Sequence, residues 1–436
     1  MLLNHNSASV IPISSFSTKI CTGATSVDDD KTGLGRRGFI HSVGLFLAGS
    51  VTDLAWSKAQ AATRIALPFA NGDRPLVAYP QKRPLMRLTT RPPQLETPFA
   101  VFREGLITPN DAFFVRYHLA NIPLSIDLAS YRLNVKGLVS KPLSLSMEEL
   151  QTGFPAVELV AVNQCSGNSR GFVVPRVGGG QSGNGAMGNA RWRGVSLRAV
   201  LAKAGVQPGA KQVTFQGLDA PLLPSTPEFV KALPIDQALD GEVMLAFQMN
   251  GSDLPMLNGY PMRLVVPGYY GTYWVKHLSE INVIDHAFEG FFMSKAYRIP
   301  DNDCGCVGAG TAAKATKPIG KMVIRSFITS LEDGAAIRVG EDILVHGIAF
   351  DSGAGIREVQ FSQDGGNSWV QAHLGEDLGS YSFRPWRIML RLNKLGSHQL
   401  KVRATSRSGE IQPLTATWNP AGYRRNVVES VRVVAL

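Results

Sequence analysis

The sequence has few cysteines and few charged residues for its length, and both scarcities limit what the protein can be. Only four cysteines, Cys21, Cys165, Cys304 and Cys306, occur among 436 residues, too few for a disulfide framework in a chain of this size. Charged residues make up 18% of the chain and hydrophobic residues 44%, which is typical of a globular protein and not of a disordered one. Each cysteine therefore needs its own explanation.

Long runs of one kind of residue are also missing. The formal net charge is +10, but the Lys and Arg residues are spread along the chain without a basic run. This distribution favours a small anionic substrate, and we expect no nucleic-acid partner. No apolar stretch reaches the roughly 20 residues that a membrane-spanning helix needs, so we expect no membrane span.

The first 61 residues have the pattern of an export signal. An arginine pair, Arg36 and Arg37, precedes a moderately apolar stretch over residues 43–56, and a small-x-small sequence ends at Ala61. This is the order found in a twin-arginine signal peptide; the alternative is a surface helix that contains two arginines by chance. Such export carries folded proteins, often with a cofactor already inserted. The segment 1–61 therefore predicts a periplasmic protein that carries a cofactor.

The rest of the chain divides into four parts by composition and periodicity. Residues 62–110 are proline-rich and look irregular, which is typical of a segment that wraps over a core. Residues 111–300 alternate strand-like apolar runs with brief helical patterns, clearest at 197–204, and indicate an α+β domain. Residues 301–321 show no apolar periodicity and predict a linker. Residues 322–436 show period-two runs between turns, which predict an immunoglobulin-like β-sandwich.

Cys165 is the cysteine whose surroundings carry the most chemistry. It follows an apolar strand-like run and is flanked by Gly, Asn and Arg residues, which is not typical of a core cysteine. A nearby arginine, Arg170, favours the thiolate, the form that binds a soft metal. From the residues alone three interpretations stay open: a buried inert cysteine, a catalytic nucleophile and a metal ligand. The nucleophile needs a histidine base, which the sequence does not single out.

The segment 114–118, Phe-Val-Arg-Tyr-His, carries polar side chains that suit an anion. If the run is extended, Arg116 and His118 lie on one face, because successive strand side chains alternate. Two donors on a common face fit an oxyanion or a phosphate. The alternative is an edge strand whose polar residues are simply solvated.

The segment 258–276 combines a strand-like run with a glycine-punctuated aromatic loop that ends in a lysine. Lys276 and Arg263 are reasonable phosphate partners on grounds of charge, and the aromatic residues around Trp274 fit the wall of a pocket for a planar cofactor. The alternative is that these aromatic residues belong to the core.

Together these segments resemble the sulfite oxidase family of molybdopterin enzymes, and most closely the bacterial periplasmic sulfite dehydrogenases. The resemblance covers nearly all of residues 100–436, and the segments match in order and spacing. They are the segment at 114–118, the Asn-Gln-Cys-Ser-Gly-Asn loop at 163–168, the Gly-Thr-Tyr-Trp-Val-Lys segment at 271–276 and the Asp-Gly-Gly-x-x-Trp turn at 364–369. The resemblance implies an α+β molybdopterin-binding catalytic domain followed by an immunoglobulin-like dimerisation domain.

The resemblance also implies roles for particular residues. Cys165 matches the protein thiolate that binds molybdenum in a dioxo molybdenum cofactor with a single pterin. Arg116, Arg170 and Tyr297 match the pocket for the sulfite anion, and the tyrosine is implied to mediate proton movement as well. The positions that match cofactor contacts, more loosely at Asp219, are Phe114, His118, Asp219, Asn258, Arg263, Trp274 and Lys276.

Two features of the chain leave questions open. Some family members carry a third pocket arginine just before the C-terminal strand; here it is displaced, and Arg424 or Arg425 is the candidate replacement. The Cys304-Gly305-Cys306 sequence fits a strained disulfide, a metal site or a pair of thiols. We expect a structural role for it or none.

The function that the resemblance implies is the oxidation of sulfite to sulfate by oxygen-atom transfer in the periplasm. The chain contains no haem-attachment C-x-x-C-H motif, so we expect a c-type cytochrome, either a subunit or a diffusing protein, to accept the electrons. The C-terminal domain implies a homodimer. One alternative is a periplasmic molybdoenzyme like the methionine-sulfoxide reductases, a branch that generally lacks this domain; another is a non-catalytic exported β-rich binding protein.

Overall fold

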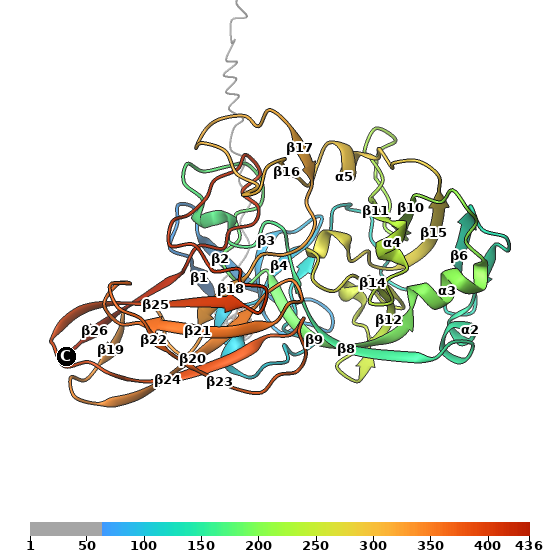
Figure 1. Cartoon of the computed structure of the whole chain (residues 1–436). Coiled ribbons are helices and arrows are strands. Elements are labelled where there is room, and N and C mark those ends of the chain that lie inside the picture. The colour runs from blue at the N-terminus through green and yellow to red at the C-terminus, as the bar shows by residue number, and fades with distance from the viewer. Residues whose placement is uncertain (1–62) are drawn as a thin grey trace, which may run out of the picture. The chain divides into compact units, whose positions relative to one another are not determined.

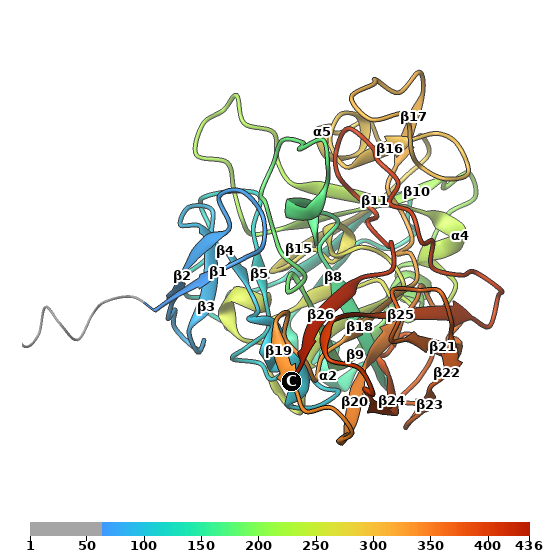
Figure 2. The same ribbon diagram turned by 90° about the vertical axis from the view of Figure 1, so that its left-hand side faces the viewer.

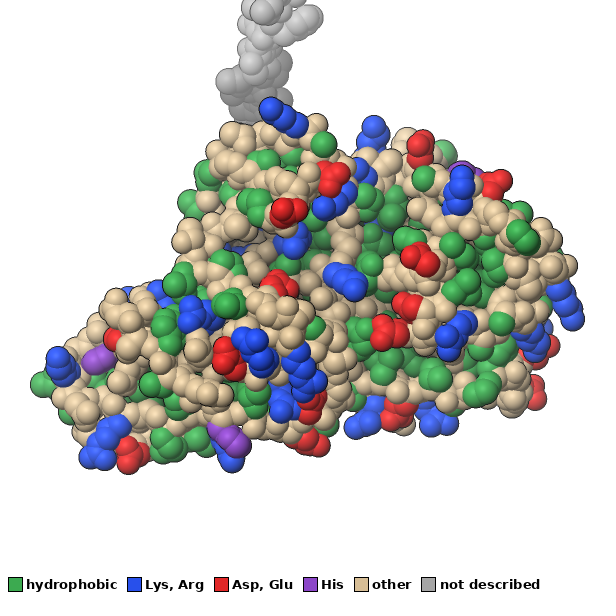
Figure 3. All heavy atoms as spheres, viewed as in Figure 1, with side chains coloured by type: hydrophobic (Ala, Val, Ile, Leu, Met, Phe, Trp, Pro, Cys, Tyr) green, Lys and Arg blue, Asp and Glu red, His purple; other side chains and the backbone are tan. Residues whose placement is uncertain are grey.

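The computed structural model describes residues 63–436, and Figure 1 follows them from blue N-terminal strands to red C-terminal ones. The expected export signal and Cys21 lie outside the described residues. Within residues 63–436, no helix combines the length and the apolar character needed to cross a membrane. On the face drawn in Figure 3, basic and acidic side chains are interspersed and do not gather into one large patch.

The N-terminal part of the described chain is a five-stranded sheet in which each strand pairs antiparallel with the next. Its strands are β1 (Arg64–Ala66), β2 (Asp73–Val77), β3 (Leu85–Thr89), β4 (Gln94–Glu96) and β5 (Val115–Arg116), with the short 3₁₀ helix η1 (Phe99–Arg103) between the last two. This corrects the expectation that residues 62–110 are irregular. Strands of two to five residues between prolines and turns are too short to show an alternating pattern.

The central part of the chain contains two further five-stranded sheets, consistent with the expected α+β domain. The first has the order β11-β10-β15-β6-β7, and the second the order β13-β12-β9-β8 with β14 paired to β12. The strands of the first are β6 (Leu133–Gly137), β7 (Leu143–Leu145), β10 (Gln212–Gly217), β11 (Val230–Pro234) and β15 (Leu278–Ile284). Those of the second are β8 (Ala156–Gln164), β9 (Met187–Ser196), β12 (Met244–Met249), β13 (Ser252–Asp253) and β14 (Arg263–Val265).

Helices in this part are short. They are α2 (Met147–Thr152), α3 (Leu197–Ala204), α4 (Ile235–Ala238), α5 (Phe291–Ser294) and the 3₁₀ helices η2 (Arg170–Phe172), η3 (Met256–Asn258) and η4 (Gly271–Tyr273). Helix α3 confirms the helix expected at 197–204, because its apolar residues recur at helical spacing and are fully buried. It ends where Gly205 adopts a left-handed conformation, φ 69°, that favours glycine.

The pairing of β8 with β9 fixes the place of Cys165. The two strands run antiparallel from Ala156 opposite Val195 to Gln164 opposite Met187. Most of β8 from Val160 onward is buried, as is Trp192 of β9, whose indole N–H donates to the Ala161 carbonyl at 3.1 Å. Cys165 follows directly where the ladder ends.

A two-stranded hairpin leads from the central part to the C-terminal domain. Strands β16 (Arg298–Pro300) and β17 (Thr316–Pro318) pair antiparallel, and Cys304 and Cys306 form a disulfide in the loop between them. Most of the segment 301–321, expected to be a linker, is therefore the loop and second strand of this hairpin. Residues 63–436 contain no group of three or more His, Cys, Asp or Glu side chains that could hold a metal ion.

The C-terminal domain consists of two sheets that share one core. Their orders are β18-β20-β24-β23 and β19-β26-β25-β21-β22. The strands are β18 (Arg325–Ile328), β19 (Ala335–Ile337), β20 (Asp342–Phe350), β21 (Ile356–Ser362), β22 (Val370–Gln371), β23 (His373–Leu374), β24 (Arg384–Arg391), β25 (Gly396–Ser406) and β26 (Ser430–Ala435). Buried side chains from both sheets, among them Val345, Trp386, Phe361 and Val402, form the core. Figure 2 shows these strands in orange and red, opposite the blue N-terminal strands.

Candidate active site

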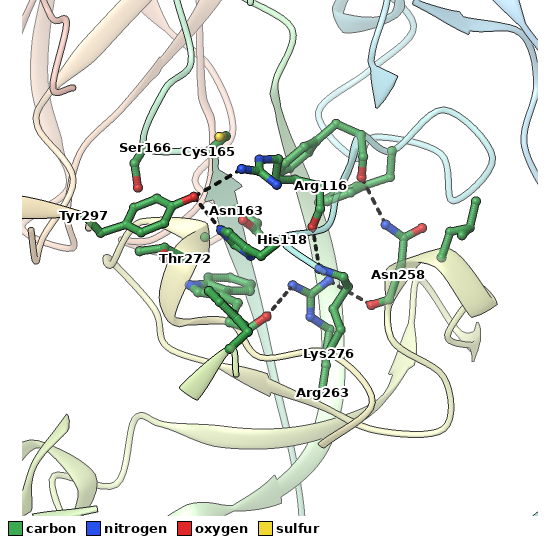
Figure 4. A pocket seen from close by; sticks show the side chains of 16 residues that line it. Arg116, His118, Asn163, Cys165, Ser166, Asn258, Arg263, Thr272, Lys276 and Tyr297 are labelled. Carbon is green, nitrogen blue, oxygen red and sulfur yellow. Dashed lines mark hydrogen bonds between the residues drawn. The ribbon is translucent and has the colours of Figure 1, made fainter. Parts of the chain in front are cut away.

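A cavity of about 490 Å³ lies where the ends of β5 and β8 meet the aromatic loop after β14 (Figure 4). It collects all the expected site residues except Arg170 and Asp219. Its walls are formed by Phe113, Phe114, Arg116, His118, Asn163, Cys165, Ser166, Phe229, Leu257, Asn258, Arg263, Gly271, Thr272, Trp274, Lys276 and Tyr297. We call it the cofactor cavity.

A second cavity, of about 370 Å³, adjoins the first and is called here the outer cavity. Phe114, Arg116 and Cys165 line both cavities, and Arg170 lines the outer one. Arg116 and Cys165 therefore lie where the two cavities meet. The two expected anion-binding arginines both face the outer cavity, beside the thiol.

Backbone contacts hold Cys165 in place. Its N–H donates to the Ala186 carbonyl at 2.9 Å, and its carbonyl accepts from the Asn168 N–H at 2.9 Å. The Asn168 side chain in turn accepts from the Ala186 N–H at 2.9 Å, which ties the loop to the segment that leads into β9. Cys165 is the only free cysteine among residues 63–436. Its thiol is thus a fixed, unpaired sulfur at the junction of the cavities.

Tyr297 joins two expected site residues through its hydroxyl group. Arg116 Nη2 donates to this hydroxyl at 3.4 Å, and His118 Nε2 shares a second hydrogen bond with it (Figure 4). Arg116 and His118 therefore do meet at a common point, although β5 itself ends at Arg116. The backbone of Tyr297 is left-handed, φ 57°, which is uncommon for a tyrosine and often accompanies functional sites.

Burial sets the protonation states of this pair. It holds the pKa of His118 well below 6.5, and the nearby Arg116 and Lys276 lower it further. Burial also raises the pKa of the Tyr297 phenol, although Arg116 acts in the opposite direction. The imidazole is therefore neutral and the phenol keeps its proton at physiological pH. The ring of Phe229 covers His118 face to face at 3.8 Å, which shields the pair from water on that side.

Arg170 is oriented by the backbone of two loops. Its Nε donates to the Ala421 carbonyl at 2.9 Å, and its Nη1 donates to the Gly180 carbonyl at 3.2 Å. Its guanidinium carbon also lies 5.0 Å from the centre of the Tyr423 ring. No hydrogen bond from Nη2 to any of residues 63–436 is present, so this nitrogen can serve a ligand.

Buried cations line the inner end of the cofactor cavity. Lys276 Nζ donates to the Arg116 carbonyl at 2.6 Å, and Arg263 donates to the Asn258 and Trp274 carbonyls at 2.9 and 3.2 Å. Burial lowers the pKa of Lys276 to about 7 and that of Arg263 to about 9. Neither forms a salt bridge within residues 63–436. Unneutralised buried cations of this kind fit an anionic ligand such as a phosphate.

Lys82 is a buried cation beside Asn258, behind the cavity wall, that no sequence pattern singled out. It is buried, and it donates to the Asn258 side chain and to the Phe113 carbonyl, at 3.0 Å for the latter. Burial lowers its pKa to about 7. Lys82 lies in the N-terminal segment taken as irregular, and no local pattern pointed to it.

Asp219 is near the cavity but not in its wall. Burial raises its pKa, and the Lys276 ammonium partly opposes this shift. Asp219 does not line the cavity, but its carboxyl group affects the charge of Lys276. The sequence also left two candidates for a third pocket arginine, Arg424 and Arg425. Arg425 pairs with Glu429 at 3.2 Å, and neither it nor Arg424 lines either cavity.

Three buried side-chain oxygen atoms in the cavity wall have no partner in the protein. They are Asn163 Oδ1, Ser166 Oγ and Thr272 Oγ1, all from side chains that are almost fully buried. Unpaired buried polar atoms are rare in native proteins, so these three indicate a polar ligand. Asn163 lies at the end of β8, Ser166 directly after Cys165, and Thr272 in η4 before Trp274. Their polar side chains next to expected site residues were the signal that could have identified them.

The donor set fits a molybdenum–pterin cofactor. A thiolate suits a soft metal, the buried cations suit the pterin phosphate, and the unpaired polar atoms suit the edges of the pterin ring.

Comparisons with known proteins agree with this chemistry. The family described as "Oxidoreductase molybdopterin binding domain" matches residues 118–292, and "Mo-co oxidoreductase dimerisation domain" matches residues 316–435. Sulfite oxidase of Gallus gallus is 33% identical over 398 residues, covering 88% of this chain and 83% of the relative. The mitochondrial sulfite oxidase of Homo sapiens is 32% identical over 385 residues, covering 84% of this chain and 69% of the relative.

A solved structure matches over a similar length. The sulfane dehydrogenase SoxCD from Paracoccus pantotrophus superimposes with a TM-score of 0.67 at 27% identity, covering 92% of each chain. The matched families, the identity to the two sulfite oxidases and the donor set of the cavity lead to one conclusion. The chain belongs to the sulfite oxidase family of molybdopterin oxidoreductases, and its cofactor is Mo-molybdopterin.

Proposed function

We propose that this protein oxidises sulfite to sulfate. The observation that carries the proposal is the meeting of Arg116, Arg170 and Tyr297 beside the free thiol of Cys165. Two guanidinium groups and a phenol next to a metal-binding sulfur suit a small oxyanion. The similarity to sulfite oxidases over more than four fifths of the chain supports the same substrate.

The bound cofactor supplies oxygen-atom transfer and accepts two electrons. Overall, sulfite and water give sulfate, two protons and two electrons. Arg116 and Arg170 hold the dianion at the junction of the cavities through charge-assisted hydrogen bonds, for which Arg170 Nη2 is free. Their positive charge favours sulfite over neutral molecules of similar size.

Tyr297 and His118 form the path for a proton. The phenol keeps its proton and can donate a hydrogen bond to the bound anion. The neutral imidazole can accept a proton at Nε2, where it already contacts the phenol oxygen. Lys276 and Arg263 hold the cofactor phosphate, and Cys165 binds the metal.

The cellular setting is part of the proposal. The twin-arginine pattern supports export to the periplasm, with a mature chain that begins near residue 62. The missing haem motif supports a c-type cytochrome as the electron acceptor. The family matched at residues 316–435 is named for dimerisation, which supports a homodimer through this domain. Its two sheets with a common core support the immunoglobulin-like assignment.

A second candidate substrate is a sulfane sulfur, because the solved structure that matches over 92% of the chain is described as a sulfane dehydrogenase. The test of both is one assay on full-length mature protein: molybdenum content, then reduction of cytochrome c or ferricyanide with sulfite or thiosulfate. Sulfite-dependent reduction supports the proposal. Full molybdenum content without it contradicts the proposal; activity with thiosulfate alone favours the second candidate, and reduction of methionine sulfoxide favours the reductase alternative.

A further inference from the structure

A loop of the C-terminal domain reaches the residues of the anion pocket. This loop joins β25 to β26, and its Trp418 indole N–H donates to the Pro175 carbonyl at 2.9 Å. Three residues further on, the Ala421 carbonyl accepts from Arg170 Nε at 2.9 Å. The segment after the Cys165 loop is therefore held by a segment far away in the sequence.

Tyr423 lies two residues after Ala421, and its ring contacts two pocket residues at once. It stacks on the ring of Tyr297 with centres 5.6 Å apart and planes 6° from parallel. The guanidinium carbon of Arg170 lies 5.0 Å from the centre of the same ring. An aromatic ring attracts a guanidinium through its electron-rich face, and it restricts the tilt of a second ring stacked on it.

Tyr423 itself is held firmly. The side chain of the buried Asn419 accepts from the Tyr423 N–H at 3.1 Å and donates to the Tyr423 carbonyl at 2.8 Å. Gly422 is left-handed, φ 61°, and an added Cβ there would lie 2.6 Å from Val177 Cγ2 and 3.0 Å from Arg170 Cγ. Only glycine allows the loop to approach Arg170 this closely.

We infer that Tyr423 is a positioning residue for Arg170 and Tyr297. The inference rests on the proposed function. Tyr423 acts through its ring: the ring sets the plane of the Arg170 guanidinium and the tilt of the Tyr297 phenol. Neither Arg424 nor Arg425 lines either cavity.

The test compares Tyr423→Phe, Tyr423→Leu and Tyr423→Met in full-length, cofactor-loaded protein. Phe keeps the ring, and we expect its KM for sulfite to stay within about twofold of the parent. Leu and Met remove the ring, and we expect KM to rise about 10-fold, as the loss of a partly buried cation–π contact implies. Met keeps most of the side-chain volume, so it remains informative should the Leu variant fail to fold. Tyr381→Leu, in the same domain but bonded to Glu242 and away from both cavities, is the matched control and should leave KM unchanged.

Two further measurements separate positioning from a merely structural role. The first is a double-mutant cycle: in an Arg170→Gln background, Tyr423→Leu should raise KM much less than in the parent, because its main partner is gone. The second is binding of sulfate by calorimetry, which needs no turnover and should weaken about 10-fold in the Leu variant but not in the Phe variant. Equal effects of Tyr423→Leu in both backgrounds, or unchanged KM and sulfate binding, would overturn the inference. Parent protein that binds sulfate but does not oxidise sulfite would instead contradict the proposed function, and the binding series would still decide the role of Tyr423.

Discussion

The hydroxyl of Tyr297 and Nε2 of His118 share a hydrogen bond at the wall of the cofactor cavity, and burial keeps both side chains uncharged. The relationship matters because sulfite oxidation releases protons next to two arginines. A cationic histidine there would add positive charge to a site that already holds several cations. A neutral one can accept a proton through the phenol and pass it on.

Replacing the tyrosine tests this path. Tyr297→Phe removes the hydroxyl but keeps the ring that stacks on Tyr423. We expect kcat for sulfite to fall by about 100-fold, the usual size of a lost proton-transfer group, with a smaller change in KM. Steady-state kinetics at constant molybdenum content measures this. Tyr131→Phe removes a buried hydroxyl that bonds a backbone carbonyl elsewhere and is the control. An unchanged kcat in Tyr297→Phe would exclude the hydroxyl from the reaction.

Arg116→Gln tests the anion pocket. It removes a charged donor at the junction of the two cavities. Hydrogen bonds to charged groups contribute about 1.5–3 kcal/mol, so KM for sulfite should rise by about 10- to 100-fold. Arg132→Gln, an exposed arginine outside both cavities, changes the net charge equally and should leave KM as it is. If the two variants had the same KM for sulfite, Arg116 would not be a substrate-binding residue.

Lys276→Gln tests the phosphate site. The cation is buried, and burial lowers its pKa to about 7. A bound phosphate favours the charged form, so the parent takes up a proton when the cofactor binds near pH 8. We expect the variant to retain clearly less cofactor after purification, by the fluorescence of the oxidised pterin. Lys203→Gln, an exposed lysine, is the control. Equal pterin content in both variants would contradict the assignment.

Lys231 predicts a pH dependence of stability. It is fully buried and donates to the Phe292 carbonyl at 2.7 Å, and burial lowers its pKa from 10.5 to about 7. Between pH 7 and 10.5 the unfolded chain therefore binds more protons at this site than the folded chain does. The contribution of this lysine to the free energy of unfolding rises with pH across that window.

Lys231→Met removes this contribution. The free energy of unfolding of the variant minus that of the parent should be larger at pH 7 than at pH 9.5, by at least about 1 kcal/mol. Urea unfolding of cofactor-free protein at the two pH values measures the difference. Lys203→Met, at an exposed position, should show no such difference. A difference of zero for Lys231→Met would mean that burial does not lower the pKa of this lysine and that it stays charged in the folded protein up to pH 9.5.

Sequence periodicity predicted the helices and strands whose own residues show a clear apolar pattern. Helix α3 follows from apolar residues at helical spacing, and β8 from a continuous apolar run that ends at the cysteine loop. The N-terminal sheet was not predicted, because strands of a few residues depend on partners elsewhere in the chain. The second strand of the hairpin that carries the disulfide was taken as part of a linker because β17 is largely exposed and has no apolar face.

The site residues likewise divide into those predicted from the sequence and those that were not. Residues inside recognisable segments, such as Cys165 and Lys276, were identified from the sequence and lie in one cavity. Lys82 and Tyr423 were missed, because only the tertiary structure brings them to Asn258 and Tyr297.

We propose that the thiolate of Cys165 holds the molybdenum, and the sulfite oxidation rate of Cys165→Ser decides whether it does. Within residues 63–436, the hydrogen bonds of Cys165 are made by its backbone and not by its thiol, so a serine at this position should leave the loop intact. A serine oxygen is a hard donor and a poor replacement for a soft thiolate. We expect turnover to fall at least about 100-fold, while the melting temperature and pterin content stay close to those of the parent. Sulfite oxidation at a rate near that of the parent, in variant protein with a full complement of molybdenum, would contradict it.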